Sequence, residues 1–219
     1  MRMSFAKFGI LLALVLTALA LPASATGPVF YSDLGSWAAA VPTYQGVDLS
    51  GYQEYDTITA GDEVCLPYDE TLTFNKDLQV YIVGSGWATW YGDQDLDTYD
   101  DADGLPVLYT LGELAVTGTF GPGTDSPLGF GLEMEPNPFE DVVMTLTLSD
   151  GSSLSQTVNG YGGAKFFGWV GGGVTAMTLS ADTDFAFGNM VKAAPEPTSL
   201  VLLGTLGVPF AIAKLRRRR

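Results

Sequence analysis

The chain has 219 residues, of which 10 are basic, 25 are acidic and none is histidine, so its formal net charge is −15 at neutral pH. The lack of histidine excludes Ser-His-Asp and Cys-His catalysis and histidine-ligated zinc, and it narrows the enzyme classes to those built on carboxylates. The single cysteine, Cys65, excludes an intrachain disulfide, and its neighbours Val64 and Leu66 predict a small buried side chain.

Residues 1–25 have the three parts of a secretory signal peptide. Arg2 and Lys7 form a basic start, an apolar stretch follows, and Ala23 and Ala25 provide the small residues of a cleavage site. The apolar stretch is short for a membrane span, because a membrane helix needs roughly 20 apolar residues. We therefore expect signal peptidase to cut after Ala25, with an uncleaved N-terminal anchor as the alternative.

Without residues 1–25 and a C-terminal segment, 195–219, the chain retains residues 26–194. This length suits one domain with a sizeable core. Of the 25 acidic residues only Glu196 lies outside the domain, whereas only three basic residues lie inside it, so its net charge is 3 − 24, or −21. Such a domain repels nucleic acid and anionic lipid and attracts divalent cations. The alternative explanation is that self-repulsion keeps a secreted protein soluble and monomeric.

One short helix is expected near the start of the domain, over residues 32–40. Ser32 is a suitable N-cap, Asp33 suits the first turn, and Pro42 lies just beyond the end. No other long stretch keeps a helical period, so the rest of the domain is expected to consist of strands and turns.

The clearest strand lies between Val142 and Leu148, where apolar residues at every second position predict one buried face. The pair Asp150 and Gly151 then predicts a turn, and residues 153–158 a returning strand. Further strands are expected at residues 78–83, 107–111, 115–120, 128–134, 164–170, 174–179 and 184–191.

These short strands and frequent turns, with 27 glycines, predict an all-β single domain, a β-sandwich or jelly roll with one short N-terminal helix. Residues 44–191 should be mostly strand. The expected core residues are Val142, Met144, Leu146, Phe167, Trp169, Met177 and Leu179.

Three aromatic residues, Trp87, Trp90 and Tyr91, precede the most acidic part of the chain. Beside carboxylates they could form a carbohydrate-binding platform, since aromatic faces stack on the apolar faces of sugar rings. Aromatic residues at such spacing are also what the core of a sandwich requires, and core packing is the preferred interpretation.

The acidic part of the chain that follows has six aspartates within 11 positions. Carboxylates at every second position, as in Asp93, Asp95 and Asp97, can turn toward one point on a curved loop, and Ca²⁺ prefers such hard oxygen ligands. The spacing is not that of an EF-hand, and a solvated acidic loop is the alternative. The candidate ligands of one Ca²⁺ are Asp93, Asp95, Asp97, Asp101 and Asp103.

A second acidic group consists of Glu133, Glu135, Glu140 and Asp141. Two carboxylates could catalyse glycoside hydrolysis as acid and nucleophile, but only at a suitable separation, which the sequence does not give. A glycoside hydrolase is therefore a distant alternative for the function of the chain.

The C-terminus has a second apolar segment, residues 199–215, about 25 Å long as a helix and barely enough to cross a hydrocarbon core. Four arginines follow it and would stay on the cytoplasmic side, because basic flanks resist translocation. They are Arg216, Arg217, Arg218 and Arg219.

Just before the apolar segment stand Pro195, Glu196 and Pro197. The order of Pro-Glu-Pro, apolar segment and arginine cluster resembles the PEP-CTERM sorting signal over about the last 25 residues. The resemblance implies a precursor held in the inner membrane until an exosortase-type membrane protease cuts near Pro-Glu-Pro. An ordinary C-terminal anchor is the alternative.

The sequence motifs at 166–169, 174–179 and 184–187, within the last three expected strands, and the opening from Phe30 to Pro42 are also similar to PEP-CTERM β-sandwich proteins. These loose apolar motifs bear on the fold and not on an activity. Where many relatives have an Asp-Asn pair in the last strand, this chain has Gly188-Asn189, so no role of that aspartate is carried over.

The resemblance implies an exported bacterial protein of the cell surface or extracellular matrix, without enzymatic activity, in an organism that makes exopolysaccharide. Its partners would be signal peptidase, an exosortase-type protease and polysaccharide, and not nucleic acid. A calcium-assisted carbohydrate-binding module is the alternative from a different functional class.

Overall fold

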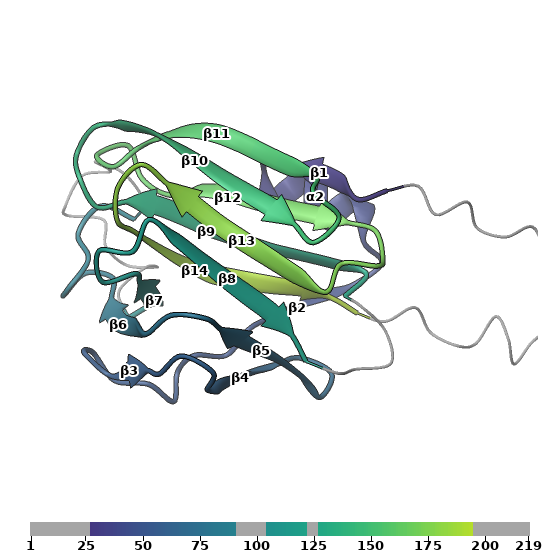
Figure 1. Ribbon diagram of the computed structural model, residues 1–219, viewed down its shortest axis with the longest axis horizontal. Helices are drawn as coiled ribbons and strands as arrows, with labels where there is room; N and C mark the ends of the chain where they lie inside the picture. Colours follow the sequence, from purple (N-terminus) through teal and green to yellow (C-terminus); the bar gives the residue numbers. More distant parts are fainter. Residues whose placement is uncertain (1–26, 91–103, 122–126, 195–219) are drawn as a thin grey trace, which may run out of the picture.

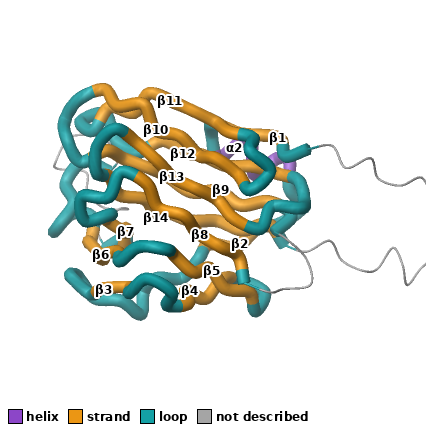
Figure 2. The backbone as a smooth tube through the Cα atoms, viewed as in Figure 1, coloured by secondary structure: helices purple, strands orange, loops and turns teal. Residues whose placement is uncertain are grey.

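The computed structural model describes residues 27–90, 104–121 and 127–194, which form two antiparallel β-sheets and one short helix (Figure 1). The predicted all-β fold with one short N-terminal helix is confirmed, and the two sheets are consistent with a β-sandwich. Figure 2 shows how little of the described chain is helical. Within these residues no helix is long and apolar enough to cross a membrane. The proposed signal peptide, calcium ligands and sorting tail lie outside the described residues.

The larger sheet has eight strands, all paired antiparallel. Seven of them follow the order β1 (Val29–Tyr31), β12 (Lys165–Val170), β9 (Gly129–Pro136), β14 (Phe185–Ala193), β7 (Pro106–Tyr109), β6 (Leu78–Ile82) and β3 (Thr57–Ile58). The eighth, β2 (Tyr44–Gly46), pairs with the last residues of β14.

The smaller sheet has six strands, again antiparallel. Their order is β11 (Ser153–Asn159), β10 (Asp141–Leu148), β13 (Ala176–Ala181), β8 (Ala115–Phe120), β5 (Glu70–Phe74) and β4 (Glu63–Leu66). The predicted hairpin is β10 and β11, joined at the Asp150-Gly151 turn, where the Leu148 and Ser152 main chains hydrogen-bond.

The core lies between the two sheets and consists of side chains from the inner face of each long strand. In β10 the residues Val142, Met144, Leu146 and Leu148 are buried, while the exposed Val143 points to the other side. This alternation explains why a one-residue slip of the register would expose the apolar set. All seven predicted core residues are buried.

Two local predictions are wrong. The helix α2 (Leu34–Ala40) is capped by Asp33 and not by Ser32, because the Asp33 carboxylate accepts a 2.8 Å hydrogen bond from the amide of Ser36. Cys65 is exposed, because it is the outward residue of β4, an edge strand whose neighbouring residues Val64 and Leu66 face the core.

The start of the first strand, β1, and the end of the last strand, β14, lie at the same end of the sandwich. Val29 pairs with Val170 and Val170 with Gly129, while the next residue of β9, Phe130, pairs with Lys192 near the end of β14. The turns that join β9 to β10, β11 to β12 and β13 to β14 lie at the opposite end (Figure 1). We call that opposite end the distal end.

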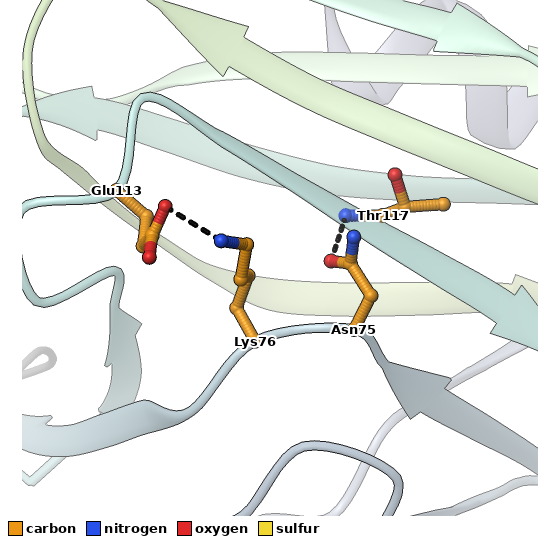
Figure 3. A network of polar contacts seen from close by, with 4 residues as sticks. All are labelled: Asn75, Lys76, Glu113 and Thr117. Carbon is orange, nitrogen blue, oxygen red and sulfur yellow. Dashed lines mark hydrogen bonds and ion pairs between the residues drawn. The ribbon is translucent and has the colours of Figure 1, made fainter.

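The three lysines of the domain each have a partner. Lys76 forms an exposed ion pair with Glu113, with 2.9 Å between Nζ and Oε2, beside a hydrogen bond from the Thr117 amide to Asn75 (Figure 3). The Lys165 ammonium donates to the carbonyl of Thr157 on β11. Lys192 of β14 is buried and forms an ion pair with Glu70 of β5, so this pair joins the two sheets.

Candidate functional site

Part of the outer face of the larger sheet is covered by residues 83–90, which we call the cover segment. A tight turn after β6, with the amides of Gly86 and Trp87 donating to the Ile82 carbonyl, directs the segment back onto the sheet. A Cβ on Gly86 would lie 2.4 Å from a carboxylate oxygen of Glu54 and 2.5 Å from the Tyr81 ring, so a larger residue would have to displace both side chains. The cover segment contributes Val83, Trp87 and Trp90 to an apolar cluster with Val107 and Ala186.

Beneath the cover segment lies a buried carboxylate, Glu135, on the outward-facing side of β9. Its Oε2 accepts a 2.7 Å hydrogen bond from the indole nitrogen of Trp87, and its Oε1 accepts a 2.5 Å bond from the hydroxyl of Thr89. The side chain of Glu135 has no exposed surface. Both carboxylate oxygens are therefore satisfied by the cover segment.

A second carboxylate, Glu133, lies two residues earlier on the same side of β9. Its Oε2 accepts a 3.0 Å hydrogen bond from the indole nitrogen of Trp90, and it also bonds the side chain of Asn189. Asn189 lies in a β-bulge of β14 between Gly188 and Val191, with φ of 44°. A bulge re-aims a side chain, here toward the carboxylate, and asparagine tolerates this left-handed backbone better than most residues.

Burial dominates the electrostatics of the pair. It raises the pKa of Glu135 to about 7 from an ordinary 4.5, although the bonds from Thr89 and Trp87 act in the opposite direction. Burial also raises the pKa of Glu133 against the bonds from Asn189 and Trp90. The two carboxyls thus hold protons at a higher pH than they would in water.

Tyrosines border the cover segment toward the edge of the sheet. Tyr81 makes edge-on ring contacts with Tyr55 and Tyr109, both at 5.4 Å between centroids, and Trp87 packs against Tyr81 and Tyr109. The Tyr109 hydroxyl donates to Asp184, and burial together with this bond raises the pKa of Tyr109 to about 12. The border is therefore a packed aromatic layer tied to the turn before β14.

The structure brings together two groups that the sequence suggested separately. Trp87 and Trp90 are 8% and 1% exposed, so their ring faces are packed inside, and they bond Glu135 and Glu133. Glu140 and Asp141 lie apart, exposed at the turn into β10.

The other predicted site residues lie outside the described residues. These are Tyr91, the proposed calcium ligands Asp93, Asp95, Asp97, Asp101 and Asp103, Ala23 and Ala25, the Pro195-Glu196-Pro197 motif and the four terminal arginines. In the part of the chain that the structure describes, no three acidic or cysteine side chains are arranged to hold a metal ion.

Two residues of the cluster were not predicted from the sequence. Thr89 looked like an ordinary position between two tryptophans. Asn189 had a signal, because Gly188-Asn189 inside a long apolar strand is the composition of a bulge. The cluster as a whole holds the cover segment on the sheet through hydrogen bonds from two indoles and a hydroxyl.

No protein-family model matches the chain, and no curated protein matches it.

Proposed function

We propose that the chain is an exported, non-enzymatic protein of the bacterial cell surface or extracellular matrix, sorted through a PEP-CTERM system. The observation that carries this proposal is the order of Pro195-Glu196-Pro197, apolar segment and four arginines directly after the domain. The precursor would be held in the inner membrane, and an exosortase-type protease would release it near the motif. The signal peptide, the membrane-spanning tail and a jelly-roll topology are parts of this proposal.

The last strand of the sandwich supports a release near Pro195. β14 ends at Ala193 and is held by three strands, β9, β7 and β2, while the amide of Ala194 donates to the carbonyl of Thr43. The described sandwich thus completes its last hydrogen bonds just before the motif. A cut at the motif would leave every one of these bonds in place.

Processing gives the first test. The secreted protein should begin at Thr26 and end near Pro195, since neither apolar segment contributes to the described core, and intact mass spectrometry measures both ends. Replacing Pro195, Glu196 and Pro197 by alanine should leave the chain in the membrane fraction. The matched control replaces Thr198 and Ser199 by alanine and should be released normally. Extracellular protein that retains the arginine tail would contradict the proposal.

The second candidate is a calcium-assisted carbohydrate-binding module, and one observation favours its metal site. The residues that flank the acidic segment are held by main-chain hydrogen bonds. The Trp90 carbonyl accepts a 2.8 Å hydrogen bond from the amide of Ala164, and the amide of Gly104 donates a 3.2 Å hydrogen bond to the carbonyl of Val83. Fixed ends reduce the entropy lost when a loop closes on a cation. We propose as ligands Asp93, Asp95, Asp97, Asp101 and Asp103.

Calcium should therefore stabilise the protein. At ten times the dissociation constant the expected gain is about 1.4 kcal/mol, or roughly 3–5 °C in melting temperature. EDTA should reverse this gain in stability, and the Asp95→Asn, Asp97→Asn double variant should not show the gain. Sodium chloride at matched ionic strength is the control, because screening alone also relieves repulsion. If calcium chloride and sodium chloride raised the melting temperature equally, the acidic segment would be a solvated loop without a calcium site.

Carbohydrate binding through Trp87 and Trp90 would require exposure of their ring faces, which are packed in the described arrangement. Turnover of a glycan panel would instead indicate the glycoside hydrolase.

A further inference from the structure

Two aromatic side chains project from adjacent turns at the distal end of the sandwich. Phe139, in the turn between β9 and β10, is 68% exposed, and Tyr161, in the turn between β11 and β12, is 51% exposed. Their ring centroids are 6.1 Å apart and the rings are nearly perpendicular, at 88°. The two rings form one small apolar patch on a strongly acidic domain.

The backbone beneath the patch is fixed. A Cβ on Gly160 would lie 2.2 Å from the carbonyl oxygen of Pro138 and 2.8 Å from that of Pro136, so only glycine lets the two turns approach this closely. The amide of Gly160 donates to the carbonyl of Glu140. The prolines restrict their own backbone as well. The backbone that carries the two rings is therefore fixed before any partner binds, which lowers the entropy cost of binding.

Polar groups border the patch. The Asn159 side-chain oxygen accepts from the amides of Tyr161 and Gly162, and its amide nitrogen donates to Asp141 at 2.7 Å. Glu140 and Asp141 are both exposed. Carboxylate oxygens accept hydrogen bonds, so the border suits a ligand that is rich in hydroxyl donors.

The size and charge of this surface decide between partners. A stable protein interface buries about 800 Å² on each side, far more than two rings offer, whereas small ligand sites need only a few aromatic and polar groups. The net charge of −21 in residues 26–194, three lysines against 24 acidic residues, repels polyanions and also a second copy of the chain. Between an anionic and a neutral polysaccharide, the charge therefore favours the neutral one, which is rich in hydroxyls and apolar on its ring faces.

We propose that Phe139 and Tyr161 form a binding site for neutral polysaccharide, in which a sugar ring stacks on the exposed face of one of the two rings, contacts the edge of the other, and donates hydroxyl hydrogen bonds to Glu140 or Asp141. The choice of ligand rests on the extracellular location proposed above. The site lies at the distal end, opposite the strand ends that lead to both termini. A precursor tethered by its C-terminus would therefore present the site away from the membrane.

The test uses the full-length chain, purified in a detergent without sugar headgroups and run in native gels that contain amylose, dextran, xylan or hydroxyethyl cellulose. At least one of these neutral polymers should retard the wild type, and the anionic polymer alginate should not. The Phe139→Ala, Tyr161→Ala double variant should bind tenfold more weakly or worse, as expected when anchoring aromatic residues are removed.

The matched control is Tyr55→Ala, which removes another exposed aromatic ring, 58% accessible, that contacts Tyr81 on the outer face of the sheet. It should bind like the wild type. Melting curves of both variants check that the fold is intact. Failure to bind any of the four neutral polymers, equal loss in the control, or retardation by alginate alone would overturn the proposal. A protein that is secreted and processed but does not bind would leave the proposed sorting standing.

Discussion

Glu70→Gln should lower the free energy of unfolding by about 3 kcal/mol, measured by denaturant titration at pH 7. The Lys192 side chain is 1% exposed, its Nζ lies 2.9 Å from Oε1 of Glu70, and it also lies 4.8 Å above the centre of the Tyr68 ring. Removing one partner of a buried ion pair costs about 3–5 kcal/mol, because the other charge stays buried without compensation. The lower end applies because the Glu70 side chain is 15% exposed.

The chain contains its own matched control in the pair of Lys76 and Glu113, which has the same 2.9 Å separation but side chains that are 38% and 44% exposed. Water and salt screen such a pair, so Glu113→Gln should cost less than about 1 kcal/mol. The double variant Glu70→Met, Lys192→Met should recover most of the loss, since it leaves no buried charge behind. If Glu70→Gln and Glu113→Gln lowered the free energy of unfolding by similar amounts, burial would not be the cause of the large effect expected for Glu70→Gln.

The long strands could be predicted because their alternation is a property of neighbouring residues. β10 is the example: Met144 and Leu146 face the core while Val143 points outward, as the sequence indicates. No individual strand was predicted before residue 78, although β1, β4 and β5 lie there. These strands have only three to five residues, too few for a periodic pattern to stand out.

The carboxylates of β9 show why the candidate site could not be predicted. Alternation with the buried residues Leu132 and Met134 indicates that Glu133 and Glu135 point away from the core, and they do. Their burial comes from the cover segment, whose bonds to them join residues 43 to 48 positions apart in the chain. Local patterns do not contain such pairings. Only the tertiary structure turns these two outward carboxylates into one buried and one half-buried group.

Stability should fall by about 3 kcal/mol between pH 4 and pH 8 because of Glu135. Its pKa is about 7 in the folded protein and near 4.5 in the unfolded chain, so the folded state binds more protons across this range. The contribution is fully present below pH 4.5 and is lost as the pH rises through about 7. A pKa difference of this size corresponds to about 3 kcal/mol.

The hydrogen bonds explain how the fold accommodates both protonation states. The Trp87 indole can only donate, so it always requires an acceptor oxygen on Glu135, whereas the Thr89 hydroxyl can donate to a carboxylate or accept from a carboxylic acid. Ionisation therefore keeps both bonds but places a charge beneath the cover segment, away from water. The free energy cost of that charge is what the pH dependence measures.

Glu135→Gln isolates this effect, because the amide keeps an acceptor for Trp87 and can donate to Thr89, but it carries no charge at any pH. The variant should match the wild type near pH 4 and exceed its stability by about 3 kcal/mol at pH 8, by denaturant titration at each pH. Repulsion within the acidic domain also grows with pH, but it cancels in this difference. Glu140→Gln, at an exposed carboxylate, is the control and should track the wild type throughout. A difference between Glu135→Gln and the wild type that stays constant from pH 4 to pH 8 would show that Glu135 does not ionise beneath the cover segment in this range.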